Sequence, residues 1–179
     1  MIVYCLFCET QKAAIVARIL ENRGMHRAFT PQILQRHRVK GQNLEKLYPL
    51  LPGYVFVYVE KELNPTLAFL GITGIIRRLG RKEDRFCLQG SDLDFAMKLY
   101  EKDGLVNQLT VFKVGDIVRL EDPLFNGCQG KISKVDYKKQ RACVEFIFAG
   151  TNCRTWIACE FISPHPADSK RAKEESSPK

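Results

Sequence analysis

The stretch from Leu51 to Val59, Leu-Pro-Gly-Tyr-Val-Phe-Val-Tyr-Val, constrains the fold of this chain most strongly. Pro52-Gly53 breaks the chain, and the alternation after it predicts a strand, because side chains point alternately to the two sides of a strand. Tyr54, Phe56 and Tyr58 share one side, and valines fill the other. The valine side predicts ordinary core. The aromatic side either packs under helices or is displayed to a macromolecular partner.

The sequence on either side of this stretch predicts further strands and helices up to residue 108. One apolar stripe at helical spacing runs from Ala13 to Leu20. Thr10 and Ser91 are expected to cap helices at their amino ends, and Gly24 and Gly104 to end them. The expected strands are 2–8, 27–39 with a break at Thr30-Pro31, 44–48, 54–59 and 75–79, and the expected helices are 11–23, 62–70 and 92–103.

The pattern changes after residue 104 to short strands and turns without a helix signal. About five strands are expected between 112 and 163, which is typical of a small β-barrel. Nothing in this part has the helical periodicity that would predict an alternative helical fold. The expected organisation is a first domain over 1–108, a linker over 109–112, a barrel over 113–163 and a disordered tail over 164–179.

Charge and composition favour a binding protein over an enzyme. The formal net charge is +8, and residues 1–108 carry 16 Lys and Arg against 11 Asp and Glu. A basic excess of this size favours contact with nucleic acid or acidic protein surfaces. None of the three histidines stands in a catalytic pattern, and the sequence has no Gly-rich phosphate loop. We therefore expect no enzymatic activity and no cofactor.

The pair Cys5 and Cys8 has the spacing of a metal or redox motif. A structural zinc site needs four ligands, usually from two such pairs, and no second pair exists. The pair also begins inside an apolar strand, so we interpret both thiols as core and expect no metal. Seven cysteines in a chain without a basic leader or cleavage site indicate a cytoplasmic protein with free thiols.

Two basic clusters in the first domain are candidate nucleic-acid contacts. One lies near the tip of the expected hairpin, and the other lies in and just after the strand over 75–79. Each could be a solvated charged face, but two clusters in one domain favour phosphate contact. The candidate residues are Arg36, His37, Arg38, Lys40, Arg77, Arg78, Arg81 and Lys82.

Several of the segments described above resemble the sequence pattern of a known family. Leu51 to Val57 resembles the FPGYV-type segment of the NusG family's amino-terminal domain, and Val3 to Leu6 stands where that family opens with a Trp/Tyr strand. Phe112 to Arg119, followed by Gly130 to Ile132 and Val135-Asp136, resembles the KOW motif. The resemblance covers nearly the whole chain in the family's domain order.

The resemblance implies an α+β fold, with an antiparallel sheet flanked by helices (the NGN domain) followed by an SH3-like KOW barrel. It also implies a transcription elongation factor that docks on the clamp helices of the largest subunit of RNA polymerase and bridges to the opposite jaw. The residues carried over as polymerase-binding are Tyr4, Leu50, Leu51, Tyr54, Phe56, Asn64 and Thr66, where Asn64 and Thr66 face the opposite jaw.

The chain departs from the housekeeping pattern in a loop of the barrel. The resemblance assigns Phe125, Asn126 and Lys131 to a loop that contacts a ribosomal protein or another factor, but Cys128 stands where housekeeping members have a second Phe. The basic hairpin and short linker are more similar to specialised paralogues of the RfaH and LoaP type. These imply antitermination and recruitment by RNA, such as a hairpin in the nascent transcript, or by an exposed DNA strand.

Three hypotheses follow. The first is a monomeric specialised paralogue that binds RNA polymerase and promotes processive antitermination with an RNA contact. The second is a housekeeping member, which differs in partners rather than mechanism. The third is a ribosome-associated or RNA-binding module built on the barrel, without affinity for polymerase. The third predicts salt-sensitive RNA binding by residues 112–163 alone.

Overall fold

The computed structural model describes residues 1–39, 42–83, 85–107, 109–114, 117–120, 124, 131–137 and 141–162, and only the backbone at 36–39, 42–43, 109–114, 117–120 and 158–162. Lys40, Phe125, Asn126 and the tail over 164–179 therefore lie outside the described residues. No helix in the described part of the chain is long and apolar enough to cross a membrane.

A four-stranded sheet forms the base of the molecule. Its order is β2 (Arg27–Phe29), β5 (Tyr54–Val59), β1 (Ile2–Cys8) and β6 (Ile75–Leu79). Neighbours in this sheet pair antiparallel. The alternation after Pro52-Gly53 predicts β5 correctly, and both of its faces are buried because each is covered by other parts of the chain.

Helix α1 (Ala13–Asn22) covers the valine face of this sheet. Its expected apolar stripe is buried, and Val16 and Leu20 share a cluster with Val55 and Val57. Gly24 follows the helix end at a φ of 86°, a conformation that glycine adopts without strain. The expected cap at Thr10 is wrong: the capping position is Lys12, and no side chain caps it.

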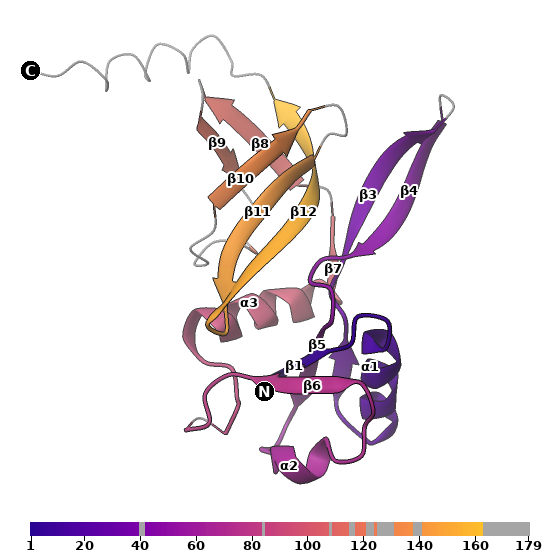
Figure 1. Ribbon diagram of the computed structural model, residues 1–179, viewed down its shortest axis with the longest axis vertical. Coiled ribbons are helices and arrows are strands. Elements are labelled where there is room, and N and C mark those ends of the chain that lie inside the picture. The colour runs from indigo at the N-terminus through magenta and orange to yellow at the C-terminus, as the bar shows by residue number, and fades with distance from the viewer. Residues whose placement is uncertain are drawn as a thin grey trace, which may run out of the picture.

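The expected hairpin is present as β3 (Gln32–Val39) and β4 (Gln42–Pro49). The two strands pair antiparallel from Gln32 opposite Pro49 to Val39 opposite Gln42, and β7 (Leu105–Val106) joins β3 in parallel. The break at Thr30-Pro31 separates β2 from β3, as expected. The hairpin extends away from the four-stranded sheet (Figure 1).

Two further helices frame the sheet. Helix α2 (Pro65–Ala68) is shorter than the predicted 62–70, begins with proline in its first turn and is capped by Asn64. Helix α3 (Gly90–Glu101) buries Phe95, Ala96 and Leu99. Its capping position is Gln89, so the expected cap at Ser91 is also wrong.

Five strands follow, as expected, in the order β10 (Lys131–Asp136), β11 (Arg141–Phe148), β12 (Thr151–Ile162), β8 (Leu109–Val114) and β9 (Ile117–Leu120). Strand β12 pairs antiparallel with β11 and then, through its last four residues, parallel with β8. Strand β8 begins at Leu109 and so contains the range 109–112 that the sequence predicted as linker.

The β11–β12 hairpin reaches down to α3 and the four-stranded sheet (Figure 1). One hydrophobic cluster joins Phe56 of β5 and Phe95 of α3 to Phe146 and Phe148 of β11. A second cluster lies between the sheet and α1. The fold is thus mixed α and β, and the part expected as barrel packs directly on the aromatic face.

Candidate functional site

The aromatic face of the sheet is the candidate site, and its residues are buried. Tyr54 and Phe56 come from β5 and share a cluster with Leu50 and Leu51, which lie just before the Pro52-Gly53 turn. Phe56 has an exposed fraction of 0%, and Tyr54 of 6%. Four of the seven residues predicted to bind polymerase therefore meet on one face, beneath another part of the chain.

The β11–β12 hairpin covers this face with aromatic rings. The ring centroid of Phe148 lies 6.1 Å from that of Tyr54, 5.5 Å from Phe56 and 5.4 Å from Phe95. Phe146 adds a contact to Phe95 at 5.7 Å. These tilted and edge-on arrangements stabilise aromatic pairs beyond simple burial.

Polar contacts also join the hairpin to the rest of the chain. The Tyr54 hydroxyl lies 3.2 Å from the Cys153 thiol, within hydrogen-bond distance. Arg77 donates to the Thr151 hydroxyl at 3.2 Å, and Gln35 donates to the backbone carbonyl of Trp156 at 3.1 Å. All three contacts are to β12, so this one strand is held by β5, β6 and β3.

Burial controls the ionisation of Tyr54, Cys5 and Cys153 at this face, and of Cys8 in the cluster of the valine face. It raises the pKa of the Tyr54 hydroxyl above its ordinary value, and the hydrogen bond with Cys153 adds to the rise. Burial likewise raises the pKa of Cys5 and Cys153, and that of Cys8 to about 11. Neutral thiols are poor metal ligands and nucleophiles, which agrees with the interpretation of Cys5 and Cys8 as core.

Tyr4 lies apart from the other predicted docking residues. It pairs with Val57, not Phe56, and belongs to the cluster on the valine face. Its hydroxyl accepts a hydrogen bond from the backbone N–H of Leu63 at 3.1 Å, and burial raises its pKa to about 12. The expectation that Tyr4 forms one floor with Tyr54 and Phe56 is therefore corrected.

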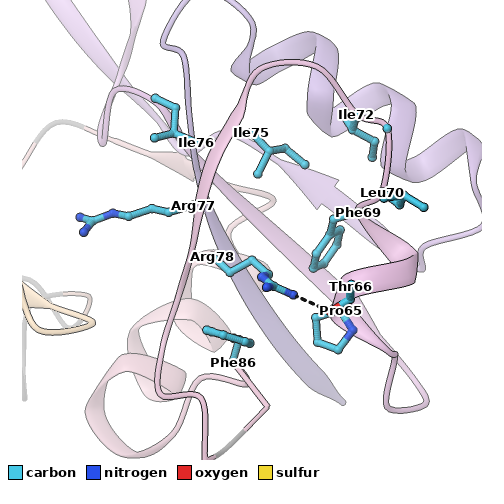
Figure 2. A pocket seen from close by; sticks show the side chains of 11 residues that line it. Pro65, Thr66, Phe69, Leu70, Ile72, Ile75, Ile76, Arg77, Arg78 and Phe86 are labelled. Carbon is cyan, nitrogen blue, oxygen red and sulfur yellow. Dashed lines mark hydrogen bonds between the residues drawn. The ribbon is translucent and has the colours of Figure 1, made fainter.

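Asn64 and Thr66 have structural contacts at the start of α2. The side-chain oxygen of Asn64 accepts from the backbone N–H of Thr66 at 3.1 Å, which caps the helix. Arg78 donates to the Thr66 hydroxyl at 3.2 Å (Figure 2). Both side chains are thus used within the protein, and Thr66 also orients an arginine.

The two basic clusters are not brought together. Arg36, His37 and Arg38 lie in β3, where only the backbone is described, whereas the second cluster lies in and after β6. Figure 1 shows the β3–β4 hairpin well separated from β6. Arg81 and Lys82 are exposed after β6, and Lys131 is exposed at the start of β10.

Sequence reasoning missed Phe95, Phe146 and Phe148 as members of this site. The alternation in Ala142 to Phe148 does place Phe146 and Phe148 on one side of a strand, but a barrel interior would use the same pattern. Tyr58, the third aromatic residue on this side of β5, is fully buried in the same cluster. Its hydroxyl donates to the Ala96 carbonyl at 2.7 Å beneath α3.

Comparison with known proteins identifies one matching family model. A model described as "Transcription termination factor nusG" matches residues 3–94, which run from β1 into α3. A solved structure described as "Domain interaction in Thermotoga maritima NusG" aligns with a TM-score of 0.48 and 15% identity, covering 87% of this chain and 92% of that chain. No curated protein matches.

Proposed function

The chain belongs to the NusG family of transcription factors, and from this premise we propose that it binds RNA polymerase and promotes processive antitermination. The observation that carries the proposal is the position of the family match. Residues 3–94 contain β5 and nearly all of β1, the strands that carry Tyr54, Phe56, Val3 and Cys5 of the aromatic face. In this proposal Tyr54, Phe56, Leu50 and Leu51 bind the tips of the polymerase clamp helices.

The chemistry of the face suits such a partner. Large aromatic side chains lying in a packed hollow are typical energetic centres of protein interfaces, and helix ends commonly dock in apolar grooves. The face already packs against one segment of the chain itself, because Phe146 and Phe148 of the β11–β12 hairpin lie in its cluster. Clamp helices would therefore compete with the hairpin for the same residues.

A partner can dock at the aromatic face only after the β11–β12 hairpin has moved away from it. Fully burying a phenylalanine side chain stabilises by about 1.5–3 kcal/mol, so the covered form is favoured in the free protein. A partner that binds only the uncovered form has its apparent affinity reduced by the fraction of molecules that is uncovered. The affinity of the proposed factor for polymerase is thus low until its aromatic face is uncovered.

The test compares two neighbouring residues of β11. Phe148 is fully buried in the aromatic cluster, whereas Ile147 has an exposed fraction of 58%. Phe148→Asp should uncover the face and tighten binding to purified polymerase by about tenfold or more, because it removes the closed-state restraint. Ile147→Asp is the matched control and should bind as the unmodified protein does.

The functional readout is transcription through an intrinsic terminator, with and without each protein. Phe148→Asp should increase readthrough at lower concentration than Ile147→Asp does. If neither variant nor the unmodified protein binds polymerase or changes pausing or readthrough, the proposal is wrong. If only residues 112–163 bind RNA, with strong salt dependence, the chain is an RNA-binding module instead.

We also propose that β8–β12 form the KOW barrel and that the β3–β4 hairpin contacts RNA. The five strands and the basic sequence of the hairpin support these proposals. Templates with and without an RNA hairpin upstream of the terminator separate a specialised antiterminator from a housekeeping factor. Changing Arg36 and Arg38 to Glu should remove the dependence on the RNA hairpin while polymerase binding persists.

A further inference from the structure

A second apolar hollow lies on the other face of the four-stranded sheet. It is formed between α2 and β6, has a volume of about 530 Å³, and none of its lining residues belongs to β11 or β12 (Figure 2). Phe69, Ile72 and Ile75 make its apolar wall and pack in or against the cluster of the valine face. The hollow therefore stays open while the hairpin covers the aromatic face.

Exposed aliphatic side chains gather at this hollow. Leu70 and Ile76 line it with exposed fractions of 65% and 59%, and neighbouring Leu67 on α2 is 66% exposed. Single exposed apolar residues are normal, but several around one hollow mark an interaction site. Removing them from water on binding would favour a partner with an apolar side chain.

Arg78 provides a fixed positive group on the wall of the hollow. Its guanidinium donates to Thr66 at 3.2 Å and lies over the Phe86 ring at 4.4 Å, so its direction is set before any partner arrives (Figure 2). No residue that lines the hollow is acidic, and no ion pair joins Arg78 to a carboxylate within the described residues. A guanidinium has five N–H donors, so several remain for a carboxylate.

The edge of β6 limits how a partner can bind. The strand has five residues, carries Arg77 and Arg78, and its pairing with β1 is irregular between Phe7 and Cys8. Short, charged and irregular edges resist the addition of another strand. A partner would therefore bind through side chains in the hollow.

We propose that this hollow docks a polypeptide segment in which an apolar side chain lies next to a carboxylate. The apolar side chain packs on Phe69, Ile72 and Ile75, and the carboxylate binds Arg78. A nucleic acid fits less well, because bases stack on aromatic faces and the face of Phe86 is occupied by Arg78. The site is separate from the aromatic face proposed to bind the clamp helices, and Thr66 is the one lining residue that was also carried over as facing the opposite jaw.

The experiment titrates the full chain with blocked tripeptides and follows the methyl resonances of Leu70, Ile72, Ile75 and Ile76 by NMR. The acidic peptide acetyl-Leu-Glu-Leu-amide should shift these signals and bind about tenfold more tightly than acetyl-Leu-Lys-Leu-amide, since a charge-assisted hydrogen bond forms only with the first. Equal binding of the two peptides, or shifts elsewhere, would overturn the proposal.

Two arginine variants provide the matched comparison. Arg78→Gln should abolish the preference for the acidic peptide, whereas Arg85→Gln should keep it, because Arg85 pairs with Glu62 and does not line the hollow. Unchanged spectra away from the hollow would show that both variants fold. A preference that persists in Arg78→Gln contradicts the proposal.

Two further titrations separate the alternatives. If oligouridine shifts the same methyl signals and the acidic peptide does not, the hollow binds RNA and the proposal is wrong. Phe148→Asp uncovers the opposite face and frees Arg77 from Thr151, but it leaves Arg78, Phe69, Ile72 and Ile75 in place, so it should bind the acidic peptide as the unmodified protein does. The outcome at this hollow is therefore independent of whether the aromatic face binds polymerase.

Discussion

The two faces of β5 are equally buried, but their covers differ in origin. Val57 on one face and Phe56 on the other both have an exposed fraction of 0%. Helix α1, which covers Val57, directly follows β1 in the chain and lies within the family match. The β11–β12 hairpin, which covers Phe56 together with α3, lies outside that match.

In the proposed function the aromatic face is a docking surface, and its buried fraction does not distinguish it from the core of the valine face. The valine face is closed by a neighbouring helix through apolar contacts, which any stable form of the sheet needs. The aromatic face is closed by a distant hairpin through rings and a few polar contacts to β12. A removable cover and a permanent one can leave the same exposed fraction.

The largest expected effect is a loss of stability caused by a charge on the valine face. Val57→Asp places a charge between the sheet and α1, where no described partner exists for it, and an uncompensated buried charge destabilises by about 3–5 kcal/mol. We expect loss of the cooperative unfolding transition in urea, followed by circular dichroism. Phe148→Asp should keep a cooperative transition, because the sheet and α1 remain intact; loss of both transitions would mean that the two covers are equivalent.

The next effect concerns the aromatic face itself. Phe56→Ala should lower the free energy of unfolding by about 3–5 kcal/mol, the usual result for a buried phenylalanine. Combining it with Tyr54→Ala should also abolish polymerase binding. Both variants should also be measured in a Phe148→Asp background. If they lower the free energy of unfolding less there, part of the loss in the unmodified protein comes from the contact with the hairpin.

A smaller effect is expected for the hydroxyl of Tyr54. Tyr54→Phe removes its contact with Cys153 while keeping the ring against Phe148, and a single hydrogen bond contributes about 1 kcal/mol. Amide hydrogen exchange in β11 and β12 should become faster by severalfold, with little change in α1. Faster exchange in α1 as well would show that the hairpin does not open separately.

The smallest expected effect is on how the stability of the covered form depends on pH. Burial raises the pKa of Tyr54 above its ordinary value of 10.0, so the covered form holds its proton where the uncovered form releases it. The covered form therefore weakens as pH rises above about 10, by about 0.8 kcal/mol at pH 10.5. Because base catalysis speeds amide exchange everywhere, the measurement is the ratio of exchange rates in β12 and α1, which should rise between pH 9 and 10.5 and rise less in Tyr54→Phe.

Features that depend on neighbouring residues were predictable from the sequence. The alternation of Tyr54 to Val59, the stripe of α1 and the paired strands of β3 and β4 are each specified within one or two elements. The caps at Thr10 and Ser91 failed because α1 begins at Ala13 and α3 at Gly90. The capping positions are therefore Lys12 and Gln89, whose side chains make no capping bond.

Features that depend on register or on distant contacts were not predictable. Strand β1 is apolar on both sides, so its sequence does not reveal that Tyr4 pairs with Val57 and faces away from Phe56. The cover by Phe146 and Phe148 joins segments far apart in the chain. A strand with this alternation can equally line a barrel, and only the folded arrangement distinguishes the two.

The separation between the aromatic face and its cover has a consequence for protein synthesis. Tyr54 and Cys153, which meet in the finished molecule, are 99 residues apart. At about 5–20 residues per second, the ribosome needs roughly 5–20 s to make the residues between them. Every newly made molecule therefore passes through a period in which Tyr54 and Phe56 have no hairpin to cover them. Chaperones or a binding partner can reach the growing chain during that interval, before it has closed for the first time.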